Sequence, residues 1–382
     1  MEKHKNILIT GGAGFIGSNL ALELIKSGHS VTVLDNLSTQ IHGQNPEVDS
    51  PLYKSIKDKV NFIKGDVTQR EDWEKAIKNQ DVIVHLAAET GTGQSMYQIE
   101  RYNKVNSYGT ALMMDILVNQ PNQVKKIVLG STRAVYGEGK YETIDQQIVY
   151  PLSRKVSDMR KGIFEIIDEN GNSLKPLPTS EDSKVHPISM YGITKANQEE
   201  IIRNVCESTD LDYVILRFQN VYGAGQSMKN PYTGILSVFS TQILTDNPII
   251  LFEDGNPVRD FVEIRDVVEA CKRSIESDKP NRRTINVGTG VPTTILNVAE
   301  CLKEAFGKET PVEISGGFRI GDIRFNVADL NLMKKYLEFE PKISLKEGIK
   351  RYVDWAKQQD VKSNNFQEAL NEMEEKRLFI KS

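Results

Sequence analysis

Residues 6–17 read Asn-Ile-Leu-Ile-Thr-Gly-Gly-Ala-Gly-Phe-Ile-Gly, an apolar run that ends in a glycine-rich loop. A short apolar run bounded by glycines, as at 6–10, is typical of a buried parallel strand. Residues 15–27 continue with helical spacing, and Gly28 stands where helices often end. A strand, a glycine loop and a helix in this order predict a phosphate-bearing ligand at the helix N-terminus.

The rest of the chain alternates apolar strand-like runs with helical stretches. This pattern predicts an α/β fold built on a Rossmann-type, doubly wound parallel sheet. After about Phe218 the pattern changes to loops, helices and short strand candidates. We therefore expect a first domain over 1–217 and a smaller C-terminal substrate-binding domain over 218–382. The further strands are expected at 31–34, 60–63, 82–86, 127–129 and 213–216 in the first domain, and near 249–252, 260–262 and 285–287 in the second.

Two segments look like additions to this plan. Residues 141–186 are polar and dotted with prolines, and we interpret them as an insert in the first domain. Residues 363–382 form a charged tail with one apolar stripe, which predicts a helix docked on the surface. The stripe consists of Phe366, Leu370, Met373 and Leu378.

The bulk composition is that of a soluble globular protein. The 382 residues carry a net charge of -4, with 39% hydrophobic and 26% charged residues. This balance argues against nucleic acid or an anionic membrane as a partner. No apolar run approaches the roughly 18 residues of a membrane span, and the three scattered cysteines have no metal-like spacing. We therefore expect a cytoplasmic protein with no metal site and no membrane segment.

The glycine loop predicts a dinucleotide site. Gly11, Gly14 and Gly17 are spaced by three; Gly14 lets the backbone approach the phosphates and Gly17 lets the helix pack against the sheet. Asp35 ends the second predicted strand, about 20 residues downstream, where a carboxylate accepts hydrogen bonds from a ribose 2′-hydroxyl. No Arg or Lys lies beside it in the sequence, so NAD is favoured over NADP.

The following strands predict further cofactor contacts. Asp66 follows the third strand and is a candidate for the adenine amino group, with a surface turn as the alternative. Small residues after His85 let the backbone lie along the nicotinamide half of the cofactor. His85 itself stands inside an apolar strand, and we interpret it as a packed histidine rather than a catalyst.

Tyr191 and Lys195 are the candidate catalytic pair. Their spacing places both on one face of a helix. To act as a base near neutral pH, a tyrosine needs its pKa lowered by about 3 units, or about 4 kcal/mol. The charges of Lys195 and of a nicotinamide ring can supply such a shift. Ser131 and Thr132 follow a predicted strand and are candidates to hydrogen-bond the reacting hydroxyl. The chain therefore has the features of a nicotinamide enzyme that oxidises an alcohol.

These motifs resemble those of the extended short-chain dehydrogenases/reductases, in the NAD-dependent sugar epimerase/dehydratase family. The resemblance covers nearly the whole chain and implies that Tyr191 is the base, that Lys195 orients the ribose, and that Thr132 assists. The first domain would then bind NAD and the second mainly a nucleotide sugar. The cofactor contacts that it implies are Gly11, Gly14, Phe15, Ile16, Gly17, Asp35, Asn36, Asp66, Val67, Leu86, Ala87, Ala88 and Asn106, with Tyr191 and Lys195.

The resemblance also implies residues that hold a nucleotide-diphosphate sugar. Asn220 matches the family asparagine at the diphosphate, and Arg259 and Arg324 resemble phosphate-binding arginines, a role that suits the guanidinium fork. A homodimer is implied as well, through the helix around 97–118 and the Tyr191 helix. The full set of expected substrate contacts is Ser95, Ser131, Thr132, Tyr191, Asn220, Gln226, Asn230, Arg259 and Arg324.

The residues after Thr132 bear on the reaction. Family members that eliminate water carry an Asp-Glu pair there, whereas this chain has Arg133 and Ala134. The resemblance thus favours 4-epimerisation through a 4-keto sugar. Finer motifs resemble the enzymes that interconvert dTDP-L-rhamnose and dTDP-6-deoxy-L-talose. The alternatives are a UDP-hexose or UDP-uronate 4-epimerase, or a dehydratase or oxidoreductase of the same family. These finer motifs include 34–37, 93–96, 133–139, 176–179 and 252–255.

Overall fold

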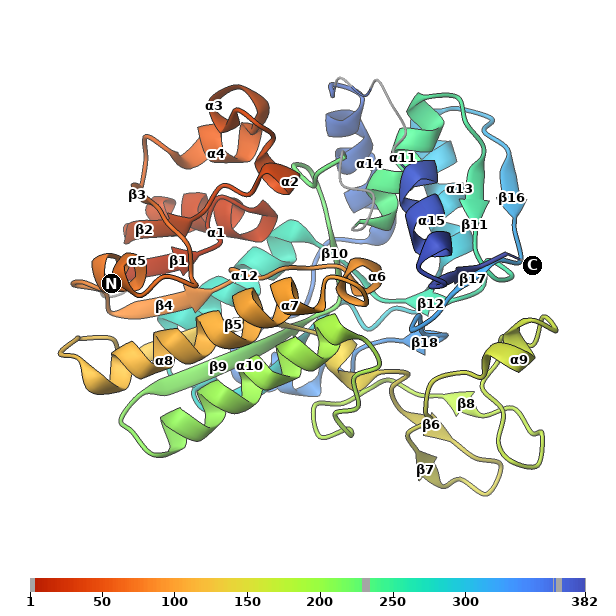
Figure 1. Cartoon of the computed structure of the whole chain (residues 1–382), viewed down its shortest axis with the longest axis horizontal. Coiled ribbons are helices and arrows are strands. Elements are labelled where there is room, and N and C mark those ends of the chain that lie inside the picture. The colour runs from red at the N-terminus through yellow and green to blue at the C-terminus, as the bar shows by residue number, and fades with distance from the viewer. Residues whose placement is uncertain (1–3, 229–233, 360, 362–365, 382) are drawn as a thin grey trace.

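A seven-stranded parallel sheet forms the centre of the structure (Figure 1). The computed structural model describes residues 4–228, 234–359, 361 and 366–381. The strand order β3-β2-β1-β4-β5-β9-β14 reverses between β1 and β4, and ligands of such sheets bind beyond the strand ends at this point. The predicted fold class is confirmed. The strands are β1 (Asn6–Thr10), β2 (Ser30–Asp35), β3 (Asn61–Lys64), β4 (Val82–His85), β5 (Lys126–Thr132), β9 (Asp212–Phe218) and β14 (Arg283–Val287).

The last strand of this sheet lies where the sequence analysis did not place it. We expected 285–287 in the C-terminal domain, but β14 pairs in parallel with β9, with Ile285 opposite Leu216. The pairing covers the hydrogen-bonding edge of β9, which would otherwise be open. Residues 218–382 therefore contribute both to the sheet and to the smaller part of the fold.

Helices cover both faces of the sheet, which explains why its strands are apolar on both sides. Ile7, Leu8 and Ile9 in β1 are fully buried. One face carries α1 (Phe15–Lys26) and α12 (Ile264–Glu276), which contact one another; the other carries α5 (Arg70–Ala76), α8 (Gly109–Asn119) and α10 (Met190–Glu207) (Figure 1). Shorter helices on the loops between strands are α2 (Thr39–His42), α3 (Pro46–Asp49), α4 (Pro51–Ile56), α6 (Thr92–Ser95) and α7 (Ile99–Tyr102).

The smaller part of the fold has its own apolar core beyond the carboxyl ends of the strands (Figure 1). Phe239, Leu302 and Tyr352 from three different helices meet in this core. Its short strands form small sheets that are separate from the large one. Its elements are β10 (Asn220–Tyr222), α11 (Ile235–Leu244), β11 (Ile249–Leu251), β12 (Val258–Arg259), β13 (Phe261–Glu263), β15 (Thr293–Thr294), α13 (Ile295–Phe306), β16 (Val312–Ile314), β18 (Phe325–Asn326) and α14 (Leu345–Ala356).

The segment 141–186 forms a small projecting unit at the lower right of Figure 1. It is held to the rest of the molecule by Arg154, whose guanidinium binds Glu253 at 2.7 Å. Phe164 contacts Phe318 edge to face, which adds an apolar anchor. The unit contains the antiparallel strands β6 (Tyr141–Glu142), β7 (Ile148–Val149) and β8 (Lys175–Pro176) and the short helix α9 (Val156–Met159).

The C-terminal tail docks as expected over its described residues, 366–381. Helix α15 (Phe366–Glu375) buries Leu370 and Met373, and β19 (Phe379–Ile380) pairs with β17 (Phe318–Arg319). Residues 363–365 of the predicted tail lie outside the described part of the chain. Across the residues that the structure describes, no helix has the length and apolar character needed to cross a membrane.

Candidate active site

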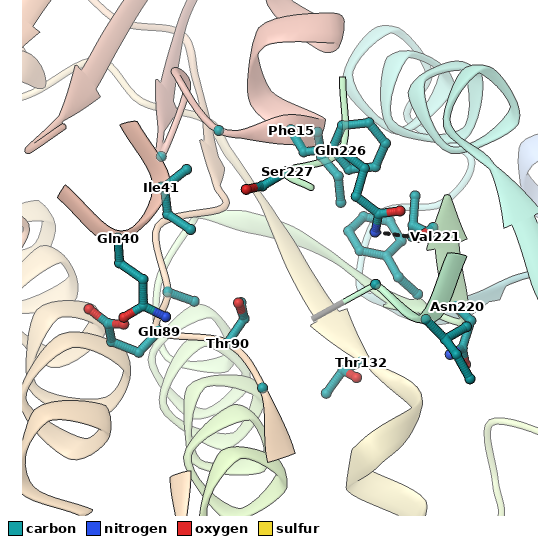
Figure 2. Close-up of a pocket in the computed structure, with 18 of the residues that line it drawn as sticks. Phe15, Gln40, Ile41, Glu89, Thr90, Thr132, Asn220, Val221, Gln226 and Ser227 are labelled. Atoms are coloured by element: carbon teal, nitrogen blue, oxygen red, sulfur yellow. Dashed lines mark hydrogen bonds between the residues drawn. The ribbon is translucent and has the colours of Figure 1, made fainter. Parts of the chain in front are cut away.

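A cavity of about 1260 Å³ opens at the carboxyl ends of the central strands, between the sheet and the smaller part of the fold (Figure 2). Single ligand pockets usually measure about 300–1000 Å³, so this cavity has room for a dinucleotide and a second ligand. In Figure 2, Gln40 and Ile41 line the left side of the view, and Asn220 and Val221 the right, with Thr132 between them.

The glycine loop is shaped for close packing, as predicted. Gly11 has a φ of +65°, and a Cβ there would lie 2.8 Å from the Ala87 backbone. A Cβ on Gly17 would lie 2.5 Å from the Gly11 carbonyl oxygen. The loop and the first turn of α1 line the cavity, and first-turn N–H groups have no partner within their helix. The part of the cavity beside the glycine loop and the first turn of α1 therefore fits the pyrophosphate of NAD.

Asp35 lies in the cavity wall with its carboxylate already partly engaged. Its Oδ2 accepts from the Ala13 N–H at 3.0 Å and its Oδ1 from the Leu37 N–H at 2.8 Å. Burial raises the pKa of Asp35, against these hydrogen bonds and the nearby His42. Each oxygen keeps a further lone pair, so the carboxylate can still accept from a ribose hydroxyl.

Two of the predicted cofactor contacts do not line the cavity. Asp66 instead accepts from the Thr68 N–H at 2.8 Å and from the Asn36 amide at 3.1 Å. Asn106 is fully buried and hydrogen-bonds both the N–H and the carbonyl of Glu89, so it shapes the loop rather than the ligand surface. The predicted contacts that do line the cavity are Gly11, Gly14, Phe15, Ile16, Gly17, Asp35, Asn36, Val67, Leu86, Ala87, Ala88, Tyr191 and Lys195.

His85 is a packed histidine, as the apolar strand around it predicted. Its side chain is fully buried in β4, with Nδ1 2.8 Å from Thr10 Oγ1 and Nε2 3.0 Å from Thr110 Oγ1. Burial lowers the pKa of His85 to about 3, and the charge of Lys195 acts in the same direction. The imidazole is therefore neutral in the folded protein at any pH where the enzyme works.

This burial predicts a pH dependence of stability. In the unfolded chain a histidine takes up a proton below about pH 6.5, whereas folded His85 stays neutral to about pH 3. The free energy of unfolding therefore decreases as the pH falls through this window, by up to about 1.4 kcal/mol per pH unit. We expect the free energy of unfolding, measured with urea, to fall by about 2 kcal/mol less in His85→Gln than in wild type between about pH 7 and pH 5. His4→Gln, at an exposed position, is the control; an equal loss in wild type and His85→Gln would contradict the prediction.

Helix α10 presents Tyr191 and Lys195 to the cavity, in the predicted i, i+4 arrangement. The Ser189 hydroxyl accepts from the Gly192 N–H at 3.1 Å, which fixes the start of the helix. A Cβ on Gly192 would lie 2.6 Å from the Ala134 carbonyl oxygen. The glycine therefore allows α10 to approach the turn after β5, and this contact brings Tyr191 beside Thr132.

Burial opposes the charged form of both members of the pair. It raises the pKa of Tyr191, while the Thr132 hydroxyl and the Arg133 guanidinium act in the opposite direction. Burial lowers the pKa of Lys195 to about 7, and Glu199 acts against it. A phenolate and an ammonium formed together would stabilise one another in this poorly hydrated place.

The predicted Ser-Thr pair divides into two roles. The Ser131 hydroxyl donates to Glu199 Oε1 at 2.5 Å, and Glu199 in turn binds Arg217 at 2.6 Å. Ser131 thus lines the cavity with its hydroxyl proton directed to a buried ion pair. Thr132 Oγ1 accepts from the Ala134 N–H at 3.2 Å and remains the hydroxyl beside Tyr191.

The structure places some of the predicted substrate contacts in the cavity lining and others outside it. Asn220, Gln226 and Arg259 line the cavity. Ser95 does not: it is fully buried, and its hydroxyl donates to the Thr92 carbonyl at 2.6 Å. Asn230 lies outside the described residues.

Arg324 is likewise absent from this cavity. Its guanidinium binds Asp254 at 2.7 Å, Glu165 at 2.5 Å and Glu253 at 3.3 Å. Three carboxylates bind this arginine, and the structure does not bring it together with the predicted substrate contacts that line the cavity. The chain places it under the 141–186 unit, where it links that unit to the smaller part of the fold.

Arg319 is a cavity residue that the sequence analysis missed. Its Nη2 donates to Asp322 at 2.6 Å, its guanidinium lies over the Phe252 ring, and its buried Nε has no hydrogen-bond partner among the described residues. Arg259 binds the same Asp322 at 2.8 Å. The available signal was the turn Arg319-Ile320-Gly321-Asp322, in which Gly321 has a φ of +81°.

Comparison with known proteins identifies the family. The model of the NAD dependent epimerase/dehydratase family matches residues 7–156 and 169–288. The chain is 36% identical to the dTDP-L-rhamnose 4-epimerase of Burkholderia thailandensis, over 93% of this chain and 96% of that protein. It resembles the crystal structure of the UDP-glucose 4-epimerase of Thermotoga maritima with UDP-glucose, with a TM-score of 0.74, 30% identity and coverage of 92% and 98%.

A second similar structure is the UDP-glucuronic acid 4-epimerase of Bacillus cereus in complex with UDP-glucuronic acid and NAD, with a TM-score of 0.75 and 26% identity over 92% of this chain and 99% of that one. The chain belongs to the NAD dependent epimerase/dehydratase family. It is an NAD-dependent sugar epimerase, an isomerase, and the predicted cofactor is confirmed.

Proposed function

We propose that this protein is a nucleotide-sugar 4-epimerase that interconverts dTDP-L-rhamnose and dTDP-6-deoxy-L-talose. The observation that carries the reaction type is Tyr191 and Lys195 on one helix face, beside Thr132, in a cavity large enough for cofactor and substrate together. The 36% identity to a dTDP-L-rhamnose 4-epimerase supports the choice of substrate. Arg133 and Ala134 after Thr132 leave no carboxylate there to drive elimination of water.

The mechanism assigns proton chemistry to the protein. NAD, when bound along the glycine loop and residues 86–88, supplies a hydride acceptor that can return the same hydride. Tyr191 takes the proton of the sugar 4-hydroxyl as that carbon is oxidised to a ketone, and gives it back on reduction. Thr132 holds the reacting oxygen. Lys195 stabilises the phenolate by its charge.

The stereochemical outcome requires the 4-keto sugar to present its opposite face before reduction. The protein therefore has to hold the nucleotide and diphosphate firmly while the sugar turns. We propose that Arg319 and Arg259, both bound to Asp322, hold the diphosphate together with Asn220. The unpartnered Nε of Arg319 is the donor that such a ligand would satisfy.

Proton NMR of the purified enzyme with dTDP-L-rhamnose and no added reductant tests this proposal. We expect signals of a second 6-deoxyhexose to appear, with no net NADH. If only UDP-glucose or UDP-glucuronic acid is converted, the reaction type stands and the substrate is wrong. Accumulation of NADH and a keto sugar would instead identify an oxidoreductase.

We also propose that the protein forms a homodimer. Large apolar side chains are exposed on the helices that cover one face of the sheet: Ile99 and Tyr108 near α7, Val118 on α8 and Ile193 on α10. Light scattering of the wild type should give twice the chain mass, and Ile193→Glu should give the monomer.

We further propose that the protein works in a reducing compartment such as the cytoplasm. Its cysteines are unpaired, among them the buried Cys206 and Cys271, and this fits reducing conditions.

A further inference from the structure

Arg133 lies at the catalytic end of the cavity. It follows Thr132 directly, opens the 3₁₀ turn η2 (Arg133–Tyr136), and is half-buried in the cavity wall. Its Nε donates to Asn220 Oδ1 at 2.9 Å. The contact follows from the sheet, because Thr132 pairs with Phe218 and the residues beyond both strand ends are brought together. Figure 2 shows Thr132 and Asn220 on this side of the cavity.

The charge of Arg133 has no counter-charge in direct contact. By contrast, two buried arginines bind carboxylates: Arg217 binds Glu199 at 2.6 Å and Arg259 binds Asp322 at 2.8 Å. No ion pair joins Arg133 to any carboxylate within the described ranges, and Asp322 serves both Arg259 and Arg319. The cavity thus holds an excess of positive charge at this end.

This arrangement is energetically unfavourable without a ligand. Burial lowers the pKa of Arg133 to about 9, and the like charge of Arg259 adds to this effect. An unpaired guanidinium in a poorly hydrated cavity is stabilised when an anion enters. A diphosphate brings two negative charges, and a guanidinium binds its oxygens bidentately. The excess charge therefore matches a nucleoside diphosphate.

The contact with Asn220 orders both side chains. Because Oδ1 of Asn220 accepts from Arg133, its amide N–H groups are left as donors. Arg133 meanwhile keeps its Nη1 and Nη2 groups for a ligand. The same guanidinium acts electrostatically on Tyr191, where it favours the phenolate. One side chain thus lies between the predicted diphosphate position and the base.

We propose that Arg133 is a positioning residue that binds the sugar-proximal phosphate through its Nη groups and aligns the sugar with Tyr191. The inference rests on the proposed function only in assuming a nucleoside diphosphate sugar. Two functions are separable here. The fork of the guanidinium holds Asn220 and the phosphate, whereas the charge alone acts on Tyr191.

Two substitutions separate these functions. Arg133→Met removes both the guanidinium N–H donors and the positive charge, whereas Arg133→Lys keeps the charge without the guanidinium geometry. We expect calorimetric binding of dTDP to the NAD-loaded enzyme to weaken about 10- to 100-fold in Arg133→Met and by a smaller factor in Arg133→Lys, with dTMP binding little changed. Arg351→Met, a surface arginine paired with Glu347, is the matched control and should bind dTDP like wild type. A loss seen only with the complete dTDP-sugar would overturn the phosphate assignment.

The titration of Tyr191 gives a second readout that a merely structural role would not change. The phenolate is followed by ultraviolet difference absorbance against the matching Tyr191→Phe protein. We expect Arg133→Met to raise the pKa of Tyr191 by about 1 unit and Arg133→Lys to leave it near the wild-type value. Unchanged dTDP binding together with an unchanged titration in Arg133→Met would overturn the proposal.

These outcomes are independent of the substrate that the enzyme converts. If wild type fails to epimerise dTDP-L-rhamnose, the proposed function is wrong. Binding of dTDP, or of UDP in parallel, and the titration of Tyr191 still decide the role of Arg133.

Discussion

Replacing Tyr191 with phenylalanine lowers kcat at least about 1000-fold and leaves NAD bound. The substitution removes the hydroxyl that α10 presents beside Thr132, which is the group proposed to take the proton of the substrate. Positioned acid–base groups contribute about 10²- to 10⁴-fold to rates. The ring itself stays and keeps its edge-to-face contact with Tyr102 at 6.5 Å, so folding should be unaffected.

The measurement is initial epimerisation rate together with NAD content and thermal unfolding of both proteins. Tyr53→Phe, whose hydroxyl contacts Glu47 on the surface, controls for loss of a phenol elsewhere. Turnover within tenfold of wild type in Tyr191→Phe would show that another group is the base. Loss of NAD along with turnover would show that the hydroxyl serves binding instead.

Gly17→Ala is expected to abolish cofactor binding and to destabilise the fold. A Cβ at this position would lie 2.5 Å from the Gly11 carbonyl oxygen and 2.6 Å from the Gly12 Cα, and both obstacles are backbone atoms. The helix α1 would have to move away from the loop, which separates its N-terminus from the pyrophosphate position. We expect at least a 100-fold loss of NAD affinity and a loss of about 1–3 kcal/mol in unfolding free energy.

NAD affinity by calorimetry and urea unfolding of the cofactor-free protein measure the two effects separately. Lys26→Ala, at an exposed position in the last turn of the same helix, is the control. It should change neither quantity appreciably, since alanine is a good helix former. Wild-type affinity in Gly17→Ala would mean that the loop tolerates the extra methyl and that the predicted phosphate position is wrong.

The parts of the fold that depend on neighbouring residues were predictable from the chain. The apolar run at 6–10, the helical spacing after it and the i, i+4 placement of Tyr191 and Lys195 are local patterns, and each formed the expected element. The burial of His85 also followed from its place in an apolar strand. The family resemblance added the sugar substrate class and the expected roles of Tyr191, Lys195 and Thr132.

Side-chain partners across the fold were not predictable in the same way. Ser131 and Thr132 are equivalent in the sequence, but only Ser131 meets Glu199, on a helix 68 residues later. Arg324 and Arg319 stand on either side of the same Gly321-Asp322 turn, and the family resemblance pointed to Arg324 alone. The tertiary structure places Arg324 against Glu165 of the 141–186 unit and Asp254 of the smaller part of the fold, whereas Arg319 lines the cavity.

The sequence by itself determined the α/β class, the glycine loop and the placement of the candidate catalytic pair on one helix, because periodicity and glycine spacing act over a single turn or strand. Tertiary structure alone decided that β14 completes the large sheet, that Ser131 is held by an ion pair, and that Arg133 meets Asn220 without a counter-charge. The reason is physical: hydrogen bonds and ion pairs between distant segments depend on where strands end in space, and no local pattern encodes that distance.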